Sequence, residues 1–437
     1  ACRRETDLRA KRNLTGVFQH WDLHDRDWNP GGIWRPVRVE ASGPVRVVHW
    51  RVRCTAVTDE RATLAVRAVL DSAEATEVEV RTTVAPDAGP HANGHGPSGG
   101  GAEHRQAWPL AQGENRLEWT VTVPEPRRWW PRALGDQPLY DVTVAVLTPP
   151  PGAGAPEPES APAGPSSVSD ERRRRIGLRT VAVDDWIFSV NGERLFLKGS
   201  NQGPARLALA DATPAELAAD VDRALAANLD FLRVHAHISR PELYDAADRA
   251  GLLLWQDLPL QWGYARGIKA QARRQAREAV DQLAHHPSVF LWCAHNEPRA
   301  VDGTDYLGCR RKRSRMCARV AAAQLLPSYN RTVLDRSLRS VLNGADGTRP
   351  VVAHSGVFPH PPTLSGTDTH LYFGWYHGRE RQFPAALRAW PRLARFVSEF
   401  GAQAVPDDAG FLHPERWPDL DWEEAEGRHA LQKGVFD

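Results

Sequence analysis

Seven short apolar runs in the second half of the chain alternate with stretches of helical pattern, and this alternation constrains the fold most. Runs of this length, rich in Val, Leu, Phe and Trp, are typical of buried strands in a parallel sheet, where a helical crossover joins each strand to the next. The runs occupy residues 194–201, 231–234, 252–257, 289–293, 350–354, 367–372 and 395–401. They predict seven strands of a parallel α/β barrel, the (β/α)8 TIM barrel, at residues 179–437.

Helical patterns fill the spaces between these runs. The first helix begins at Thr213-Pro-Ala-Glu216, where an N-cap threonine, an N1 proline and an N3 glutamate mark a helix start. The second runs from Pro241 to Gly251, the third covers about residues 268–285, and a long helix covers about residues 317–342. A hairpin around Asn191-Gly192 precedes the first barrel strand.

The first 178 residues follow a different rhythm. Alternating apolar and polar residues predict strands at residues 45–53, 62–70, 77–84, 115–123 and 139–146, which indicates an immunoglobulin-like β-sandwich over residues 43–178. Two insertions rich in Pro, Gly, Ala and Ser, at residues 85–103 and 148–169, cannot bury enough apolar area to offset the entropy of ordering, so we expect disordered loops. Residues 1–42 hold too few strands to bury a core, and we expect them to be the end of another domain.

The charge balance argues against some partners. Lys and Arg total 55 against 54 Asp and Glu, which leaves no net field to favour nucleic acid or an anionic membrane. No run of about 18 apolar residues could span a bilayer. The first residues lack the apolar segment of a signal peptide, which favours a cytoplasmic location without settling it. The five cysteines have no zinc-type spacing, and we expect free thiols. Whether the protein forms a homo-oligomer is left open.

Each predicted barrel strand ends in polar residues. Parallel barrel strands place their carboxyl ends around one mouth, so these side chains should converge there. They are Asn201, Arg233, His235, His237, Asp257, Asn296, Glu297, His354, His370, Tyr372 and Glu399. Glu297 and Glu399 form the important pair, because displacement at an acetal carbon needs one proton donor and one nucleophile. A carboxyl separation of about 5–5.5 Å would predict retention of configuration, and about 6.5–9.5 Å would predict inversion.

Other features allow two further interpretations. His235-Ala-His237 at a strand end is also how metal-dependent amidohydrolase barrels begin, with zinc bound by the histidines, but here the fourth strand carries Asn-Glu-Pro and no bridging lysine. Alternatively, the glutamates only hydrogen-bond a sugar in a noncatalytic carbohydrate-binding protein. Trp262 and Trp375 follow strands, where they would stack on a sugar face, whereas Trp255 lies inside a strand and is more typical of core packing.

An ordered series of motifs resembles glycoside hydrolase family 2, which contains β-galactosidases, β-glucuronidases and β-mannosidases. The motifs are Gly31-Gly-Ile-Trp-Arg-Pro-Val37, Lys198-Gly-Ser-Asn201, Leu232-Arg-Val-His235, Trp255-Gln-Asp257, His295-Asn-Glu-Pro298, Tyr372-Phe-Gly-Trp-Tyr376 and Ser398-Glu-Phe-Gly401. The resemblance covers nearly the whole chain. It implies a jelly-roll sugar-binding domain with residues 1–42 as its tail, then an immunoglobulin-like sandwich, a catalytic TIM barrel and retention of configuration.

The resemblance also implies roles for individual residues. Glu297 would be the acid/base, Glu399 the nucleophile and Asn296 the contact to the sugar 2-hydroxyl. Tyr372 would hydrogen-bond the nucleophile, and Arg233 would orient it. The remaining candidates for substrate contact are Asn201, His235, Asp257, His370 and Trp375. This mechanism needs Glu399 ionised and Glu297 protonated, and we expect burial and the neighbouring carboxylate to keep the proton on Glu297.

These observations predict a retaining exo-glycoside hydrolase that cleaves a terminal β-linked hexose from an oligosaccharide or other glycoside by double displacement. Trp255-Gln-Asp257 resembles the β-mannosidases, whereas Tyr372-Phe-Gly-Trp-Tyr376 resembles the β-glucuronidases. Residues 401–406 lack the Asn-x-Lys carboxylate clamp of glucuronidases, which favours a neutral β-linked hexoside. We expect no cofactor and no metal. The chain stops before an eighth strand, so we expect a fragment whose open barrel is poorly stable.

Overall fold

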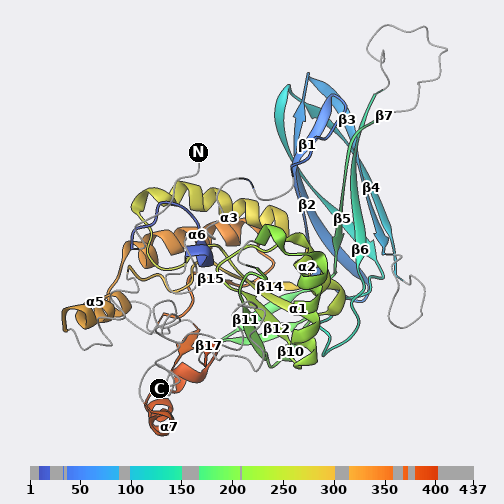
Figure 1. Cartoon of the computed structure of the whole chain (residues 1–437). Coiled ribbons are helices and arrows are strands. Elements are labelled where there is room, and N and C mark those ends of the chain that lie inside the picture. Colours follow the sequence, from blue (N-terminus) through green and yellow to red (C-terminus); the bar gives the residue numbers. More distant parts are fainter. Residues whose placement is uncertain are drawn as a thin grey trace, which may run out of the picture.

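Two bodies of different architecture make up the protein. The computed structural model describes residues 9–19, 33, 37–87, 99–149, 167–206, 209–300, 314–357, 368–372 and 379–401. Figure 1 shows a tall β-sandwich standing beside a unit of mixed helices and strands. The fold is therefore multidomain, of β plus α/β type, as the sequence predicted.

The sandwich consists of two antiparallel sheets that pack face to face. One sheet has the strand order β1 (Val45–Val57), β2 (Arg61–Ser72) and β5 (Gly113–Pro124). The other has the order β4 (Ala102–Leu110), β3 (Thr76–Pro86), β6 (Tyr140–Thr148) and β7 (Ser167–Ile176). Alternate residues of β2, β3, β5 and β6, and most inward residues of β1, point into a shared core, and the Trp119 indole inside it donates to the Thr82 hydroxyl at 3.0 Å.

Two of these strands lie where the sequence analysis predicted none, so the boundaries of the two insertions were wrong. β4 begins at Ala102, and β7 begins at Ser167, inside the ranges 85–103 and 148–169. In β4 only Leu110 is buried, and the arginines of β7 pair with acidic neighbours, for example Arg175 with Asp87 at 3.1 Å. Neither strand therefore shows the apolar alternation on which the prediction relied. Residues 88–98 and 150–166 lie outside the described residues.

The α/β unit contains all seven predicted strands, and each pairs in parallel with a neighbour. Five form one sheet in the order β11 (Gly199–Gln202), β12 (Phe231–Val234), β13 (Leu253–Asp257), β14 (Val289–Cys293) and β15 (Val351–Val352). The strands β16 (Thr369–Leu371) and β17 (Val397–Phe400) form a second parallel pair. The first and seventh strands meet, because Asn201 Nδ2 donates to the Ser398 carbonyl at 3.4 Å.

A small antiparallel sheet precedes these strands. It has the order β10 (Glu193–Leu195), β9 (Ile187–Val190) and β8 (Val181–Asp184). The predicted hairpin at Asn191-Gly192 is confirmed, and both turn residues have positive φ (51° and 89°), as a type I′ turn requires. Phe188 of this sheet packs edge-on against Phe290 of β14, so aromatic side chains fill the space beneath the parallel sheet.

The first three helices agree with the sequence pattern, the longest predicted helix is wrong, and the short helix at residues 383–389 was not predicted. The helices are α1 (Pro214–Ala226), α2 (Pro241–Ala250), α3 (Lys269–Leu283), α5 (Ser314–Leu325), α6 (Asp335–Ala345) and α7 (Phe383–Ala389). Thr213 forms the predicted capping box, and Gly251 ends α2 with φ 73°. The predicted helix 317–342 is wrong, because α5 ends before Pro327 and a π-helical turn η5 (Asn330–Leu334) leads into α6. A proline lacks the N–H that would continue the helix.

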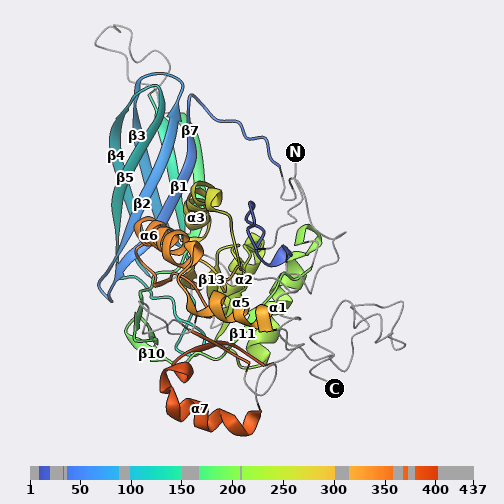
Figure 2. The ribbon, with the colours of Figure 1, turned by 90° about the vertical axis from the view of Figure 1, so that its left-hand side faces the viewer.

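The sandwich and the N-terminal segment contact different parts of the α/β unit. Arg51 of β1 pairs with Asp281 of α3 at 2.8 Å, and α3 lies beside β1 in Figure 2. Residues 9–19 instead follow the loops after β12 and β13, where the Val17 amide donates to the Ala236 carbonyl at 3.0 Å. Among the described helices, none has both the length and the apolar character needed to cross a bilayer.

Candidate active site

Arg233, in the middle of β12, is the centre of the polar cluster at the carboxyl ends of the strands. Its side chain is fully buried, and its guanidinium stacks over the Trp255 ring at 5.2 Å. Three neighbours accept hydrogen bonds from it: Asp257 at 3.1 Å, Glu399 at 2.9 Å and Asn296 at 2.7 Å. One guanidinium therefore fixes groups from β13, β14 and β17 relative to each other.

His370 of β16 bridges the two glutamates that the sequence singled out. Its Nδ1 lies 2.9 Å from Glu297 Oε1 and 3.2 Å from Glu399 Oε2. A ring nitrogen of His370 and one carboxylate oxygen of each glutamate all lie within 4.8 Å of one another. Burial lowers the pKa of His370, but the two carboxylates outweigh burial and raise it. The structure therefore brings Glu297 and Glu399, which are 102 residues apart in sequence, onto one imidazole.

Glu399 is held as a carboxylate. Burial alone would raise its pKa, but His370, His235 and Arg233 outweigh burial and hold the pKa well below its ordinary value. Tyr372 donates from its hydroxyl to Glu399 Oε2 at 2.5 Å, and burial together with this carboxylate raises the pKa of the tyrosine. The carboxylate oxygens of Glu399 thus face several donor groups, which suits a group that must stay ionised.

Glu297 differs from the expectation. Burial and the Glu399 carboxylate raise its pKa, but the Arg299 guanidinium and the His370 hydrogen bond outweigh them and hold the pKa at about 2. Arg299 donates directly to Glu297 Oε1, and the Trp262 indole donates to Oε2 at 3.3 Å. The expectation of a protonated Glu297 is wrong for this state of the protein, because it did not include the arginine two residues later.

The other predicted contacts divide into three groups. Asn296 and His235 lie in the cluster, with His235 Nε2 3.4 Å from Glu399 Oε1. Asp257 is fully buried behind Arg233, where it also accepts from the Trp255 indole at 2.8 Å and therefore positions the arginine. Asn201 of β11 is exposed, and its side chain donates to the Ser398 carbonyl. Trp375 lies outside the described residues.

Besides Arg299, sequence reasoning missed two residues beside His370. Ser355 Oγ lies 2.9 Å from His370 Nε2 and 2.5 Å from Asp368 Oδ2, so this serine and aspartate fix the back of the bridging imidazole. Ser355 directly follows the predicted strand 350–354, and Asp368 lies inside the predicted run 367–372, so both could have been found as polar residues of these segments. The sequence analysis chose His354 instead, which pairs with Asp335 at 3.2 Å.

The two histidines of the His235-Ala-His237 motif do not share a site. His237 is fully buried, its Nδ1 lies 3.0 Å from the His235 carbonyl, and burial lowers its pKa to about 4. Of the described residues, the groups whose geometry would suit a metal ion are Glu297 with His370 and Glu399, and Asp245 with Asp248 and His286. Neither group contains the motif, so the geometry does not support the amidohydrolase interpretation.

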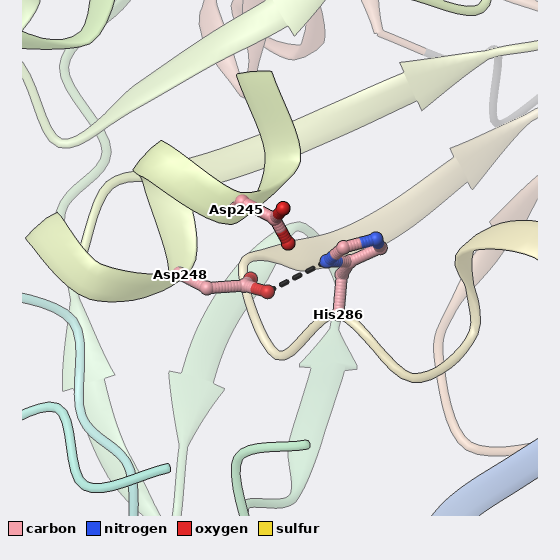
Figure 3. A group of neighbouring side chains, drawn as sticks. All are labelled: Asp245, Asp248 and His286. Atoms are coloured by element: carbon pink, nitrogen blue, oxygen red, sulfur yellow. Dashed lines mark hydrogen bonds and ion pairs between the residues drawn. The ribbon is translucent and has the colours of Figure 1, made fainter. Parts of the chain in front are cut away.

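The second of these groups lies apart from the strand mouth, and Figure 3 shows its three side chains. His286 Nδ1 is 2.6 Å from Asp248 Oδ2, and Asp248 Oδ1 accepts from the Ser288 amide at 3.0 Å. Asp245 lies on the same side of the imidazole, and burial raises its pKa. The hydrogen bonds of Asp248 join α2 to the turn before β14, which gives this group a structural role.

Comparisons with known proteins show which family this chain resembles. The family model described as "Glycosyl hydrolases family 2" matches residues 45–149, from β1 through β6. A beta-mannosidase of Capra hircus is 24% identical over 433 residues, covering 87% of this chain and 42% of that protein. Beta-mannosidase A of Aspergillus terreus is 32% identical over 194 residues, covering 39% of this chain and 19% of that protein. The chain is similar to members of glycoside hydrolase family 2. The resemblance found in the sequence motifs is therefore confirmed.

Solved structures of glycosidases share the fold of this chain. A beta-D-mannosidase from Dictyoglomus thermophilum superimposes with a TM-score of 0.65 at 21% identity, covering 94% of this chain and 47% of that one. A beta-glucuronidase from Bacteroides uniformis gives 0.60 at 19% identity, covering 83% of this chain and 42% of that one. The chain spans less than half the length of each protein named here.

Proposed function

We propose that this chain carries the active site of a retaining exo-glycosidase that removes a terminal β-linked hexose, with a β-mannoside as the favoured substrate. The observation that carries the proposal is the shared contact of Glu297 and Glu399 with His370, which puts an oxygen of each within 4.8 Å of the other. Carboxyl groups of retaining glycosidases lie about 5–5.5 Å apart, whereas inverting enzymes need room for a water between them.

The environments of the two carboxylates support different roles. Glu399 accepts from Arg233 and Tyr372 and stays ionised, so it is suited to attack the anomeric carbon. Glu297 then protonates the leaving oxygen and afterwards takes a proton from the attacking water. Because Arg299 favours the ionised form of Glu297, substrate binding must separate this pair, and Glu297 must take up a proton from solvent before the acid step.

Asn296 and the fold complete the proposal. The Asn296 side chain is held by Arg233 beside Glu297, where it would contact the sugar 2-hydroxyl. We assign the parallel strands to a TIM barrel over residues 179–437, since β11 and β17 meet and their carboxyl ends carry the cluster. We assign residues 1–42 to the end of a jelly roll and residues 43–178 to an immunoglobulin-like sandwich. The names of the relatives favour β-mannosides among the candidate substrates.

The test is hydrolysis of 4-nitrophenyl β-mannoside, β-glucuronide and β-galactoside. Activity on one of them, with release of the β-anomer first in NMR, is the expected result. Glu399→Gln should abolish turnover, whereas the control Glu278→Gln, on the exposed face of α3, should not change it. Glu297→Ala should lower kcat by about 10²–10⁴-fold and recover with azide. Sugar binding without turnover in the unmodified protein would instead support a noncatalytic carbohydrate-binding protein.

A further inference from the structure

A buried ion pair lies behind the strand end that carries Glu297, and the catalytic steps above do not use it. Asp335, the first residue of α6, and His295, which follows β14, are both fully buried. Asp335 Oδ1 lies 2.7 Å from His295 Nδ1. Burying such a pair is costly unless its geometry is good and its remaining polar atoms are satisfied, so its presence next to the cluster calls for an explanation.

The other side of the imidazole also faces an acceptor. His295 Nε2 is 2.7 Å from the carbonyl oxygen of Trp262, in the loop after β13. A neutral imidazole has one N–H, but a carboxylate and a carbonyl both accept, so only the imidazolium can donate to both. His354 lies 3.2 Å from the other oxygen of Asp335, and the Tyr264 ring packs edge-on against His295.

Trp262 is the residue on which this pair acts. Its φ of 65° is in the left-handed region, which is unfavourable for a bulky side chain and persists only where the surroundings enforce it. Its amide donates to the Asn296 carbonyl at 3.1 Å, and its carbonyl accepts from His295. Its indole N–H then reaches Glu297 Oε2 at 3.3 Å. The strained backbone thus aims a donor at the proposed acid/base.

A local irregularity brings Asp335 to this position. The amide of Asp335 donates to the Asn330 carbonyl, five residues earlier, and so closes the π-helical turn η5. Such turns insert one extra residue into a helix and occur often at functional sites. Here Leu334 and Leu338 pack into the core while Asp335 is also buried, facing His295. Figure 1 shows α6 in orange, coming from a part of the chain well after β14.

We propose that Asp335 and His295 are positioning residues for Glu297, because they clamp the Trp262 carbonyl and so hold the indole N–H on the Glu297 carboxylate. The inference rests on the proposed function of Glu297. It predicts that weakening the clamp slows the step in which Glu297 donates a proton. Substrates whose leaving group needs more protonation should therefore lose more activity. Neither residue touches the substrate.

The test compares two substrates with different leaving groups. Asp335→Asn should lower kcat/KM for 4-nitrophenyl β-mannoside about 100-fold, since misplacing a catalytic group by about 1 Å costs this much. The loss for 2,4-dinitrophenyl β-mannoside should be at least about tenfold smaller, because that leaving group needs little protonation. Equal losses for the two substrates would overturn the proposal. Trp262→Phe, which removes the indole N–H donor and keeps an aromatic ring, should reproduce the selective loss if Asp335→Asn does not fold.

A matched control comes from the other end of α6. Asp346 is also fully buried and also accepts from an indole, that of Trp292, at 2.6 Å. Asp346→Asn should change kcat/KM for the two substrates by the same factor, whatever it does to the free energy of unfolding.

A second measurement does not depend on activity. The indole ¹H–¹⁵N resonance of Trp262, assigned with Trp262→Phe, should shift in Asp335→Asn and remain in place in Asp346→Asn. An unshifted resonance in Asp335→Asn would overturn the positioning role. If the unmodified protein hydrolyses none of the glycosides, the proposed function fails, and this resonance still decides whether the clamp exists.

Discussion

Replacement of Arg233 by methionine should destabilise the α/β unit by about 3–5 kcal/mol at pH 7. Methionine fills a similar volume, but it leaves the buried Asp257 and Glu399 carboxylates without the guanidinium that lies 2.9 Å from each. Breaking a buried ion pair by removing one partner costs about 3–5 kcal/mol, because a charge stays buried without compensation. At about 2–4 °C per kcal/mol for a unit of this size, the midpoint of thermal unfolding should fall by on the order of 10 °C.

The effect should depend on pH in a definite direction. Burial raises the pKa of Glu399, but His370, His235 and Arg233 together depress it, so Glu399 contributes stability above its unfolded-state pKa, and that contribution is lost as the pH falls through the folded pKa. Without Arg233, the pKa of Glu399 in the folded protein rises, and the stability that Glu399 contributes becomes smaller. The loss of stability caused by Arg233→Met should therefore be complete at pH 7 and smaller at pH 4.

Guanidinium unfolding followed by tryptophan fluorescence at pH 7 and pH 4 measures this difference. The control is Arg179→Met, because Arg179 is equally buried but donates to carbonyl oxygens, those of Pro287 at 3.0 Å and Val289 at 2.6 Å. The free energy of unfolding that is lost in Arg179→Met should be similar at both pH values. A pH-independent loss for Arg233→Met, or a loss below about 1 kcal/mol, would refute the account of the buried cluster.

Three further predictions concern single contacts. Arg299→Ala removes a cation that lowers the pKa of Glu297, so the basic limb of the kcat/KM profile should move to higher pH; an unmoved limb would contradict the pairing. Thr213→Ala deletes the N-cap of α1 and should cost about 1 kcal/mol in denaturant unfolding, whereas Thr213→Ser should cost little. Gly251→Ala should cost at least about 1–2 kcal/mol in the same assay, because φ is 73° and a Cβ would meet the Arg132 amide nitrogen at 2.6 Å; no loss would contradict that conformation.

Local signals in the sequence explain which elements were predictable. The capping box at Thr213 and the glycine after α2 are short-range features whose hydrogen bonds form within a few residues, so their pattern alone identified them. The strands β12, β13 and β14 are buried on both faces and therefore appear as apolar runs. β7 was missed because its arginines bond to residues far away in sequence, such as Asp141. The break at Pro327 was visible and was overlooked.

The polar residues of the candidate site were also largely visible as strand ends, but their states were not. Arg233, His370 and Glu399 were identified because a buried strand that ends in a charged residue is unusual. The ionised state of Glu297 depends on Arg299 and on an imidazole from β16. The role inferred for Asp335, which lies 40 residues after His295, depends on a π-helical turn. No periodic pattern encodes either contact.

The sequence by itself determined the order of the seven parallel strands, the start of α1, the end of α2, and the residue types that reach the carboxyl ends of the strands. These depend on periodicity, capping and turn chemistry, which act over a few residues. Only the tertiary structure decided that one imidazole would join Glu297 to Glu399, that Arg299 would hold the proposed acid in its ionised form, and that Asp257 would lie behind Arg233. Electrostatic states depend on distance in space, and parallel strands bring together residues that the sequence separates by a hundred positions or more.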